Sequence, residues 1–268
     1  MPPWQAALLG LVEGLTEFLP VSSTGHLILL DHLLGQQGAG AHAFEIVIQA
    51  GALLAVVVHY RQRLAGLLAG LAAREPGAVR LATALVVAFV PAAALGLLLG
   101  KKIKRLLFGP LPVAAALIGG GLLMLALPWL LRRRERVEGL EHVTPRRALA
   151  IGVGQCAALW PGMSRSMSTI LAAEVAGLTT ATAAEFSFLL ALPTLGAATA
   201  YEALKSWHDL VAEVPPASIA VGLVTSFVVA WVVIAAFVRS LGRVGLVPFG
   251  VYRIALGSLV LWRLVPWG

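Results

Sequence analysis

Charged residues are scarce in this sequence. Only 12% of the 268 residues are Asp, Glu, Lys or Arg, whereas 59% are hydrophobic. A soluble domain carries about 25% charged residues, because polar side chains must cover much of its surface. The composition therefore excludes a water-soluble globule with a single core, and the same numbers exclude intrinsic disorder. It is typical of a helical protein that crosses a membrane several times.

Cysteine is almost absent as well. The single residue, Cys156, excludes an intrachain disulfide and a metal site built from cysteines. The first apolar segment has no basic region before it and carries Glu13 and Glu17, so it does not resemble a cleaved signal peptide.

Basic residues outnumber acidic ones, and the net charge is +7. In a soluble protein this excess would suggest a nucleic-acid partner. Here the basic residues lie in short clusters between apolar runs, as in residues 101–105. Such clusters are typical of loops that face anionic lipid headgroups. We therefore expect membrane lipids, and no nucleic acid, among the partners.

Long apolar runs set the predicted architecture. A helix of roughly 20 apolar residues spans the hydrocarbon core of a bilayer. Six runs fit this length, and a shorter one, 64–73, fits a tilted span or an interfacial helix. The six runs are residues 43–60, 79–99, 113–131, 183–204, 218–238 and 246–265.

Two further apolar segments, 4–34 and 148–178, are each interrupted near the middle. The first is broken at residues 20–25 (PVSSTG) and the second at residues 160–166 (WPGMSRS). Proline ends a helix, and Ser or Thr can cap the helix that follows. Two half-helices joined at membrane depth form a re-entrant hairpin, which is tolerated where irregular backbone lines a cavity in the protein.

The two interrupted segments also indicate an internal repeat. Pro20 and Pro161 lie 141 residues apart, and Glu45 and Glu185 lie 140 apart. Paired interrupted helices in corresponding halves point to a binding site where the repeats meet. We thus predict one all-α, polytopic membrane domain over residues 1–268. Its two re-entrant hairpins belong to repeat halves of about 1–140 and 141–268, and we expect these halves to be inverted.

The first break carries a cluster of reactive side chains. Glu13 and Glu17 share one helix face, and two carboxylates so placed repel each other unless a cation or a proton lies between them. They are predicted to form a metal site or an acid–base pair. The alternative is a single neutral acid that is hydrogen-bonded within the helix bundle. Ser23 and His26 follow within the same apolar segment, either as reactive groups or as a helix cap and a core histidine.

The second break carries features of an anion site. Arg165 offers a permanently charged fork that matches phosphate, at a half-helix N-terminus where free amides favour an anion. Gly162 allows close approach of the backbone, and Ser164 and Ser166 flank the arginine. The alternative is an arginine that pairs with Glu13 or Glu17 and binds no substrate.

Together the two breaks provide acids, a nucleophile and an anion cradle. This combination indicates phosphoryl transfer, and no P-loop or Rossmann fingerprint is present. A phosphate handled inside an apolar protein is most simply a lipid phosphate. A hypothesis from another class is a polyprenyl-phosphate transporter or flippase, because broken helices and paired repeats also occur in transporters.

At these residues the sequence resembles the undecaprenyl-diphosphate phosphatases, also called bacitracin-resistance proteins. Residues 13–26 (EGLTEFLPVSSTGH) match the first signature of that family, and residues 161–166 (PGMSRS) with Thr169 resemble the second. Similarity continues at residues 44–45, 185–191 and 252–253, so it spans nearly the whole chain. Met167 is a departure, because the family usually has glycine at this position.

The resemblance implies hydrolysis of undecaprenyl diphosphate to undecaprenyl phosphate and inorganic phosphate. This reaction recycles the lipid carrier for peptidoglycan synthesis and confers resistance to bacitracin. The resemblance also implies a multi-pass protein of the bacterial inner membrane, with interdigitated inverted repeats and an active site that opens to the outer side. Dependence on Mg²⁺ or Ca²⁺ belongs to the same expectation, and a homodimer is compatible with it.

Residue roles follow from the same resemblance. The acids Glu13 and Glu17 would bind the metal or transfer protons. Ser23 or His26 would attack phosphorus while the other assists, and we favour Ser23 as nucleophile with His26 as its base. The diphosphate would be held by Arg165, Ser164, Ser166, Thr169 and Gly162.

Overall fold

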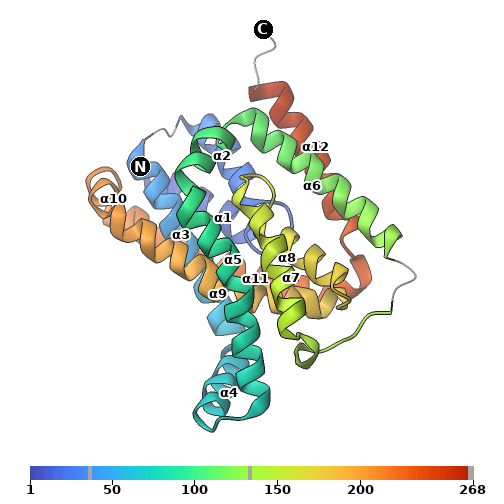
Figure 1. Ribbon diagram of the computed structural model, residues 1–268. Helices are drawn as coiled ribbons and strands as arrows, with labels where there is room; N and C mark the ends of the chain where they lie inside the picture. Colours follow the sequence, from blue (N-terminus) through green and yellow to red (C-terminus); the bar gives the residue numbers. More distant parts are fainter. Residues whose placement is uncertain (36–37, 132–134, 265–268) are drawn as a thin grey trace.

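The computed structural model describes residues 1–35, 38–131 and 135–264, and this part of the chain is helical (Figure 1). No strand is present among these residues apart from an isolated parallel bridge between Val137 and Leu178. The helices are α1 (Pro3–Thr16), α2 (Ser23–Leu34), α3 (Ala39–His59), α4 (Arg61–Ala72), α5 (Pro76–Leu107), α6 (Pro110–Leu130), η1 (Leu140–His142), α7 (Pro145–Gln155), η2 (Cys156–Leu159), α8 (Arg165–Val175), α9 (Thr180–Lys205), α10 (Trp207–Glu213), α11 (Pro216–Val244) and α12 (Val247–Leu264).

Five of these helices, α3, α5, α6, α9 and α11, are long and apolar enough to cross a membrane. They correspond to the first five predicted spans, so the all-α, polytopic membrane fold is confirmed. The sixth predicted run, 246–265, forms α12, which is not one of the five, and residue 265 lies outside the described residues. The shorter run, 64–73, lies in α4, which is also not one of the five.

Both interrupted segments are broken near the predicted positions, and the first break covers residues 17–22 where the sequence predicts 20–25. In the first, α1 ends at Thr16 and α2 begins at Ser23; in the second, α7 and η2 end before a turn that leads into α8 at Arg165. Ser22 and Ser164 cap α2 and α8 with their side chains and share an unusual backbone, with φ of +73° and +68°. This local correspondence agrees with an internal repeat. Re-entry into the membrane and inversion of the repeats stay predictions.

Close helix packing through small residues holds the fold together, as is common in membrane proteins. Helix α1 packs on α11, and a Cβ at Gly10 would lie only 2.5 Å from the carbonyl oxygen of Gly222. Helices α6 and α12 run side by side along one edge of the molecule (Figure 1). There a Cβ at Gly121 would lie 2.7 Å from the carbonyl oxygen of Gly250. These contacts fix α1 and α12, and both helices contribute to the site.

Several charged residues in apolar segments have protein partners away from the breaks. Glu185 accepts hydrogen bonds of 2.7 and 3.0 Å from the Arg63 guanidinium. Glu174, which is buried, lies 3.4 Å from Arg136 and also accepts a hydrogen bond from Thr180. These pairs compensate the cost of charge in an apolar environment. The first joins α4 to α9, and the second joins α8 to the segment before η1 and to the start of α9.

Candidate active site

The two breaks meet in the interior of the protein. The Ser166 hydroxyl donates a 2.9 Å hydrogen bond to the carbonyl oxygen of Leu19, which joins the start of α8 to the turn after α1. The guanidinium of Arg165 lies 3.6 Å from the carboxylate of Glu17. Residues almost 150 positions apart in the sequence therefore form one polar cluster inside an apolar fold.

Glu17 is the centre of this cluster. Its Oε2 accepts a 2.7 Å hydrogen bond from the Ser23 hydroxyl, while its Oε1 faces Nη2 of Arg165. All three side chains are buried, with exposed fractions below a tenth. A carboxylate that accepts from a serine hydroxyl can take its proton, which is the arrangement of a nucleophile beside a general base.

Both ring nitrogens of His26 contact groups other than the Ser23 hydroxyl. Its Nδ1 lies 2.7 Å from the carbonyl oxygen of Ser22, and its Nε2 lies 2.6 Å from the hydroxyl of Tyr252. Because a carbonyl oxygen can only accept, Nδ1 of the neutral ring carries the proton and Nε2 accepts from Tyr252. The structure thus places Glu17, and not His26, against Ser23.

The Arg165 guanidinium has N–H groups that form no hydrogen bond within the described part of the protein. Its Nη1 donates to the carbonyl oxygen and the hydroxyl of Ser187, at 3.0 and 3.3 Å. Its Nε and Nη2 are buried and have no hydrogen-bond partner among the described residues, and Nη2 has only the 3.6 Å ion pair with Glu17. The Phe18 ring packs against the guanidinium, 5.8 Å from ring centroid to Cζ. Such buried, unsatisfied donors are costly, and an anionic oxygen would satisfy them.

The hydroxyl groups near Arg165 form hydrogen bonds that hold the turn before α8 and its first residues in place. Ser164 caps α8 by accepting from the backbone amide of Met167, and its Oγ lies 3.0 Å from that of Ser166. Thr169 contacts the Ser187 hydroxyl at 2.6 Å. Direct contact of these hydroxyls with a diphosphate stays a prediction, whereas their role in holding α8 and Arg165 in place is visible.

Glu13 lies one turn before Glu17 on α1 and is 1% exposed. Its Oε1 is buried and has no hydrogen-bond partner among the described residues. A carboxylate oxygen left in this state requires a proton or a cation. This observation supports the predicted acid or metal-ligand role of Glu13.

Arg253 of α12 ties both breaks together. Its guanidinium is fully buried and donates to the carbonyl oxygens of Gly162 at 2.8 Å, Ala116 at 3.1 Å and Pro20 at 3.4 Å. Gly162 has φ of +95°, and a Cβ there would lie 2.6 Å from the carbonyl oxygen of Val113. Gly162 is therefore needed for close packing of the turn on α6.

Sequence reasoning missed the contacts of Ser187, Tyr252 and Arg253 with the predicted residues. Ser187 and Arg253 are fully buried polar side chains within apolar helices, and that placement is itself a signal of function. Tyr252 precedes Arg253 and is half-exposed. No short-range sequence pattern connects these three residues to the breaks, so only the fold brings them together.

The family model and the similar proteins all indicate the same family. Residues 6–259 match the model of a family described as bacitracin resistance protein BacA. The chain is 58% identical over 263 residues to an undecaprenyl-diphosphatase of Sorangium cellulosum, covering 97% of this chain and 85% of that protein. It is 47% identical over 256 residues to an undecaprenyl-diphosphatase of Sphingopyxis alaskensis, covering 95% and 96%. It is also 47% identical over 260 residues to undecaprenyl-diphosphatase 1 of Burkholderia ambifaria, covering 96% and 94%.

Proposed function

The chain belongs to the bacitracin resistance protein BacA family, and from this premise we propose that it hydrolyses undecaprenyl diphosphate to undecaprenyl phosphate and inorganic phosphate. The reaction returns the lipid carrier to peptidoglycan synthesis and confers resistance to bacitracin. The observation that carries the proposal is the Glu17 carboxylate, placed between the Ser23 hydroxyl and the Arg165 guanidinium. The direct test is release of phosphate from the lipid by the purified protein.

In the proposed reaction Ser23 is the nucleophile. Its Oγ attacks the terminal phosphorus while its proton passes to Glu17, and the bond from phosphorus to the bridging oxygen breaks. Undecaprenyl phosphate leaves with the electron pair of that bond. Water then attacks the phosphoserine, which regenerates the hydroxyl and releases inorganic phosphate. The 2.7 Å hydrogen bond from Ser23 to Glu17 supports this assignment of the base.

Arg165 holds the terminal phosphate and stabilises the charge that it carries in the transition state. The buried Nε and Nη2 donors support this role, because they have no hydrogen-bond partner among the described residues. Electrostatic stabilisation by positioned donors in a water-poor site is a large contribution to catalysis of phosphoryl transfer. Ser187 and Phe18 keep the guanidinium in position.

His26 is proposed to act on the leaving group or on the attacking water, and not as the nucleophile. The hydrogen bond from Tyr252 occupies the lone pair on Nε2 that an attacking imidazole would need. The stacked arrangement of the two rings, with centroids 5.6 Å apart, fixes the orientation of the imidazole. Tyr252 can in turn pass or receive a proton on the half-exposed side of the site.

The residues around Glu17 fit a divalent cation. Glu13, Glu17 and Ser23 provide only oxygen donors, which Mg²⁺ and Ca²⁺ prefer, and the unpartnered Oε1 of Glu13 supports the fit. We propose that Glu13 and Glu17 hold this ion. When bound, it would neutralise negative charge on the diphosphate oxygens.

Removal of divalent metal is expected to lower phosphate release at least tenfold, because two neighbouring carboxylates and a diphosphate would then repel each other in an apolar site. The measurement compares phosphate release by detergent-purified protein in excess chelator with release after Mg²⁺ or Ca²⁺ is added back. Undiminished turnover in the chelator would contradict the proposed metal site.

Arg253→Lys is expected to lower kcat about tenfold or more. An ammonium group cannot span three carbonyl oxygens on separate segments as the planar guanidinium does, and a hydrogen bond to a charged group contributes about 1.5–3 kcal/mol. The matched control is Arg263→Lys on the same helix, because Arg263 is exposed and stacks on Trp262. Phosphate release and Tm are measured together. Wild-type turnover in Arg253→Lys would show that the two breaks hold their arrangement without it.

The last proposals concern the membrane in which the protein lies, its orientation and its oligomeric state. The substrate class named for the relatives and the five apolar helices support a multi-pass membrane protein that binds a polyprenyl diphosphate. We further propose that the protein lies in the bacterial inner membrane with its site open to the outer side, and that it can form a homodimer. The family membership supports the first two proposals.

A further inference from the structure

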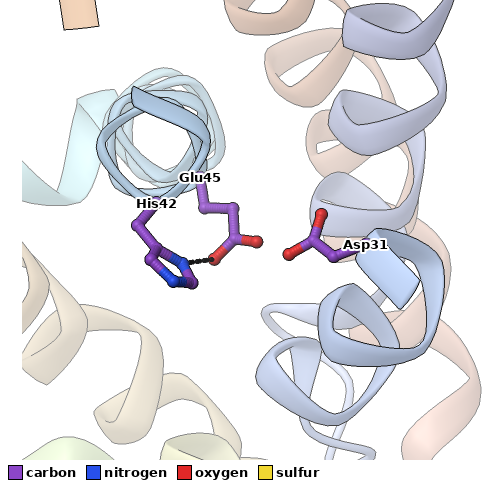
Figure 2. A group of neighbouring side chains, drawn as sticks. All are labelled: Asp31, His42 and Glu45. Carbon is purple, nitrogen blue, oxygen red and sulfur yellow. Dashed lines mark ion pairs between the residues drawn. The ribbon is translucent and has the colours of Figure 1, made fainter. Parts of the chain in front are cut away.

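A second cluster of ionisable side chains contains none of the residues assigned to the reaction. Asp31 lies in the last turn of α2, and His42 and Glu45 lie in the first two turns of α3. Figure 2 shows the imidazole of His42 and the carboxylates of Glu45 and Asp31 pointing toward one common space between the two helices. None of the three has a role in the proposed hydrolysis.

The geometry of the cluster suits one ion. One ligand atom from each residue lies within 4.8 Å of the others, and Nδ1 of His42 is 3.8 Å from Oε2 of Glu45. Divalent cations bind such atoms at about 2.0–2.6 Å. Two ligand atoms of the same cation therefore lie no more than about 5 Å apart, a condition that all three residues meet.

An independent observation also points to a ligand. Oδ1 of Asp31 and Oε1 of Glu45 are buried atoms, and neither has a hydrogen-bond partner among the described residues. No lysine or arginine in the described part of the chain forms an ion pair with either carboxylate. Two facing carboxylates with buried, unsatisfied oxygens require a cation or a shared proton.

We propose that Asp31, His42 and Glu45 form a second divalent-cation site, selective for Zn²⁺ over Mg²⁺ and Ca²⁺. The imidazole is the reason for this selectivity, because histidine nitrogen suits Zn²⁺ whereas Mg²⁺ and Ca²⁺ prefer sites made only of oxygen. The His42 side chain is 75% exposed, so an ion reaches the site from solvent. Water completes the coordination on that side.

The position of the site gives the ion a structural role. It would join the C-terminal end of α2 to the N-terminal end of α3. Helix α2 also carries Ser23 and His26 at its opposite end. Bound Zn²⁺ would thus fix a half-helix that positions two residues of the reaction site, and it would raise the stability of the folded protein.

The test is Zn²⁺ binding, measured by isothermal titration calorimetry on detergent-purified protein without a histidine tag and after removal of metals. Wild type is compared with Asp31→Asn, His42→Ala and a matched control, His142→Ala. The control is matched because His142 lies 3.9 Å from the carboxylate of Glu141 and His42 lies 3.8 Å from that of Glu45, and both imidazoles are exposed. His142 and Glu141 are not part of a three-residue cluster among the described residues.

Asp31→Asn and His42→Ala are each expected to weaken Zn²⁺ binding at least tenfold, whereas His142→Ala leaves it within twofold of wild type. Zn²⁺ should also raise the Tm of wild type and of the control but not that of the other two variants. Equal affinity in all four proteins, or no Zn²⁺ binding by wild type, would overturn the proposal and favour a proton shared between Asp31 and Glu45. Binding is measured without turnover, so this outcome is independent of whether the protein hydrolyses the lipid.

Discussion

Arg165→Ala is expected to lower kcat/KM for undecaprenyl diphosphate at least a hundredfold, which corresponds to roughly 2.7 kcal/mol of transition-state stabilisation. The guanidinium is buried, and two of its nitrogens have no hydrogen-bond partner among the described residues. In the proposed complex these donors bind the terminal phosphate, and alanine removes both the charge and the donors. Steady-state phosphate release over a range of lipid concentrations measures the effect.

Two companion variants separate this role from a loss of structure. Arg147→Ala removes another arginine whose donors bind the backbone, at the carbonyl oxygens of Ala176 and His142, and it should leave kcat/KM within threefold of wild type. Arg165→Lys keeps the charge but not the planar fork, so it should fall between wild type and Arg165→Ala. A kcat/KM of Arg165→Ala within threefold of wild type, with an unchanged Tm, would mean that Arg165 only forms the ion pair with Glu17 and does not bind the phosphate.

Ser23→Ala is expected to reduce kcat at least a thousandfold, because loss of a nucleophile removes the covalent route and not only a contact. Ser240→Ala is a suitable control, since its hydroxyl donates to the backbone of its own helix at the carbonyl of Phe237. The two proteins are compared in the same phosphate-release assay with saturating lipid. Near-normal turnover of Ser23→Ala would instead favour His26 as the nucleophile.

The same substitution tests the pairing of Ser23 with Glu17. If the carboxylate acts as base for this hydroxyl, the double variant Ser23→Ala/Glu17→Ala should lose clearly less activity than the product of the two single losses. Multiplication of the two single effects would mean that Glu17 acts on a different group. A chemical trap for a phosphorylated serine, read by mass spectrometry of the digested protein, gives a second measurement of the nucleophile.

The sequence predicts the helical segments and the two breaks well, because both depend on local chemistry. Proline at positions 20 and 161 and the serine caps at Ser22 and Ser164 act over a few neighbouring residues. Apolar length alone predicts the five long helices. The clustering of Glu17 with Arg165 also follows from a simple rule, since charges that are expensive in an apolar environment are expected to meet.

Contacts between distant segments could not be predicted in this way. Helical spacing favoured His26 as the partner of Ser23, because the two lie on the same half-helix. In the fold the Ser23 hydroxyl instead donates a hydrogen bond to Glu17 at the end of α1. The imidazole of His26 is hydrogen-bonded to Tyr252 of α12. Which side chain faces which neighbour depends on how α12 packs against α6 and the breaks, and no local pattern encodes that packing.

The most direct test of the central claim is the product balance of wild-type protein with undecaprenyl diphosphate and a divalent metal. The account predicts one inorganic phosphate and one undecaprenyl phosphate for each lipid consumed. The rate should be far above that of the Glu17→Ala variant, which lacks the carboxylate that joins Ser23 to Arg165. Phosphate release by wild type no faster than by Glu17→Ala would contradict the account. A lipid that is bound or moved across the membrane without loss of phosphate would make the protein a transporter.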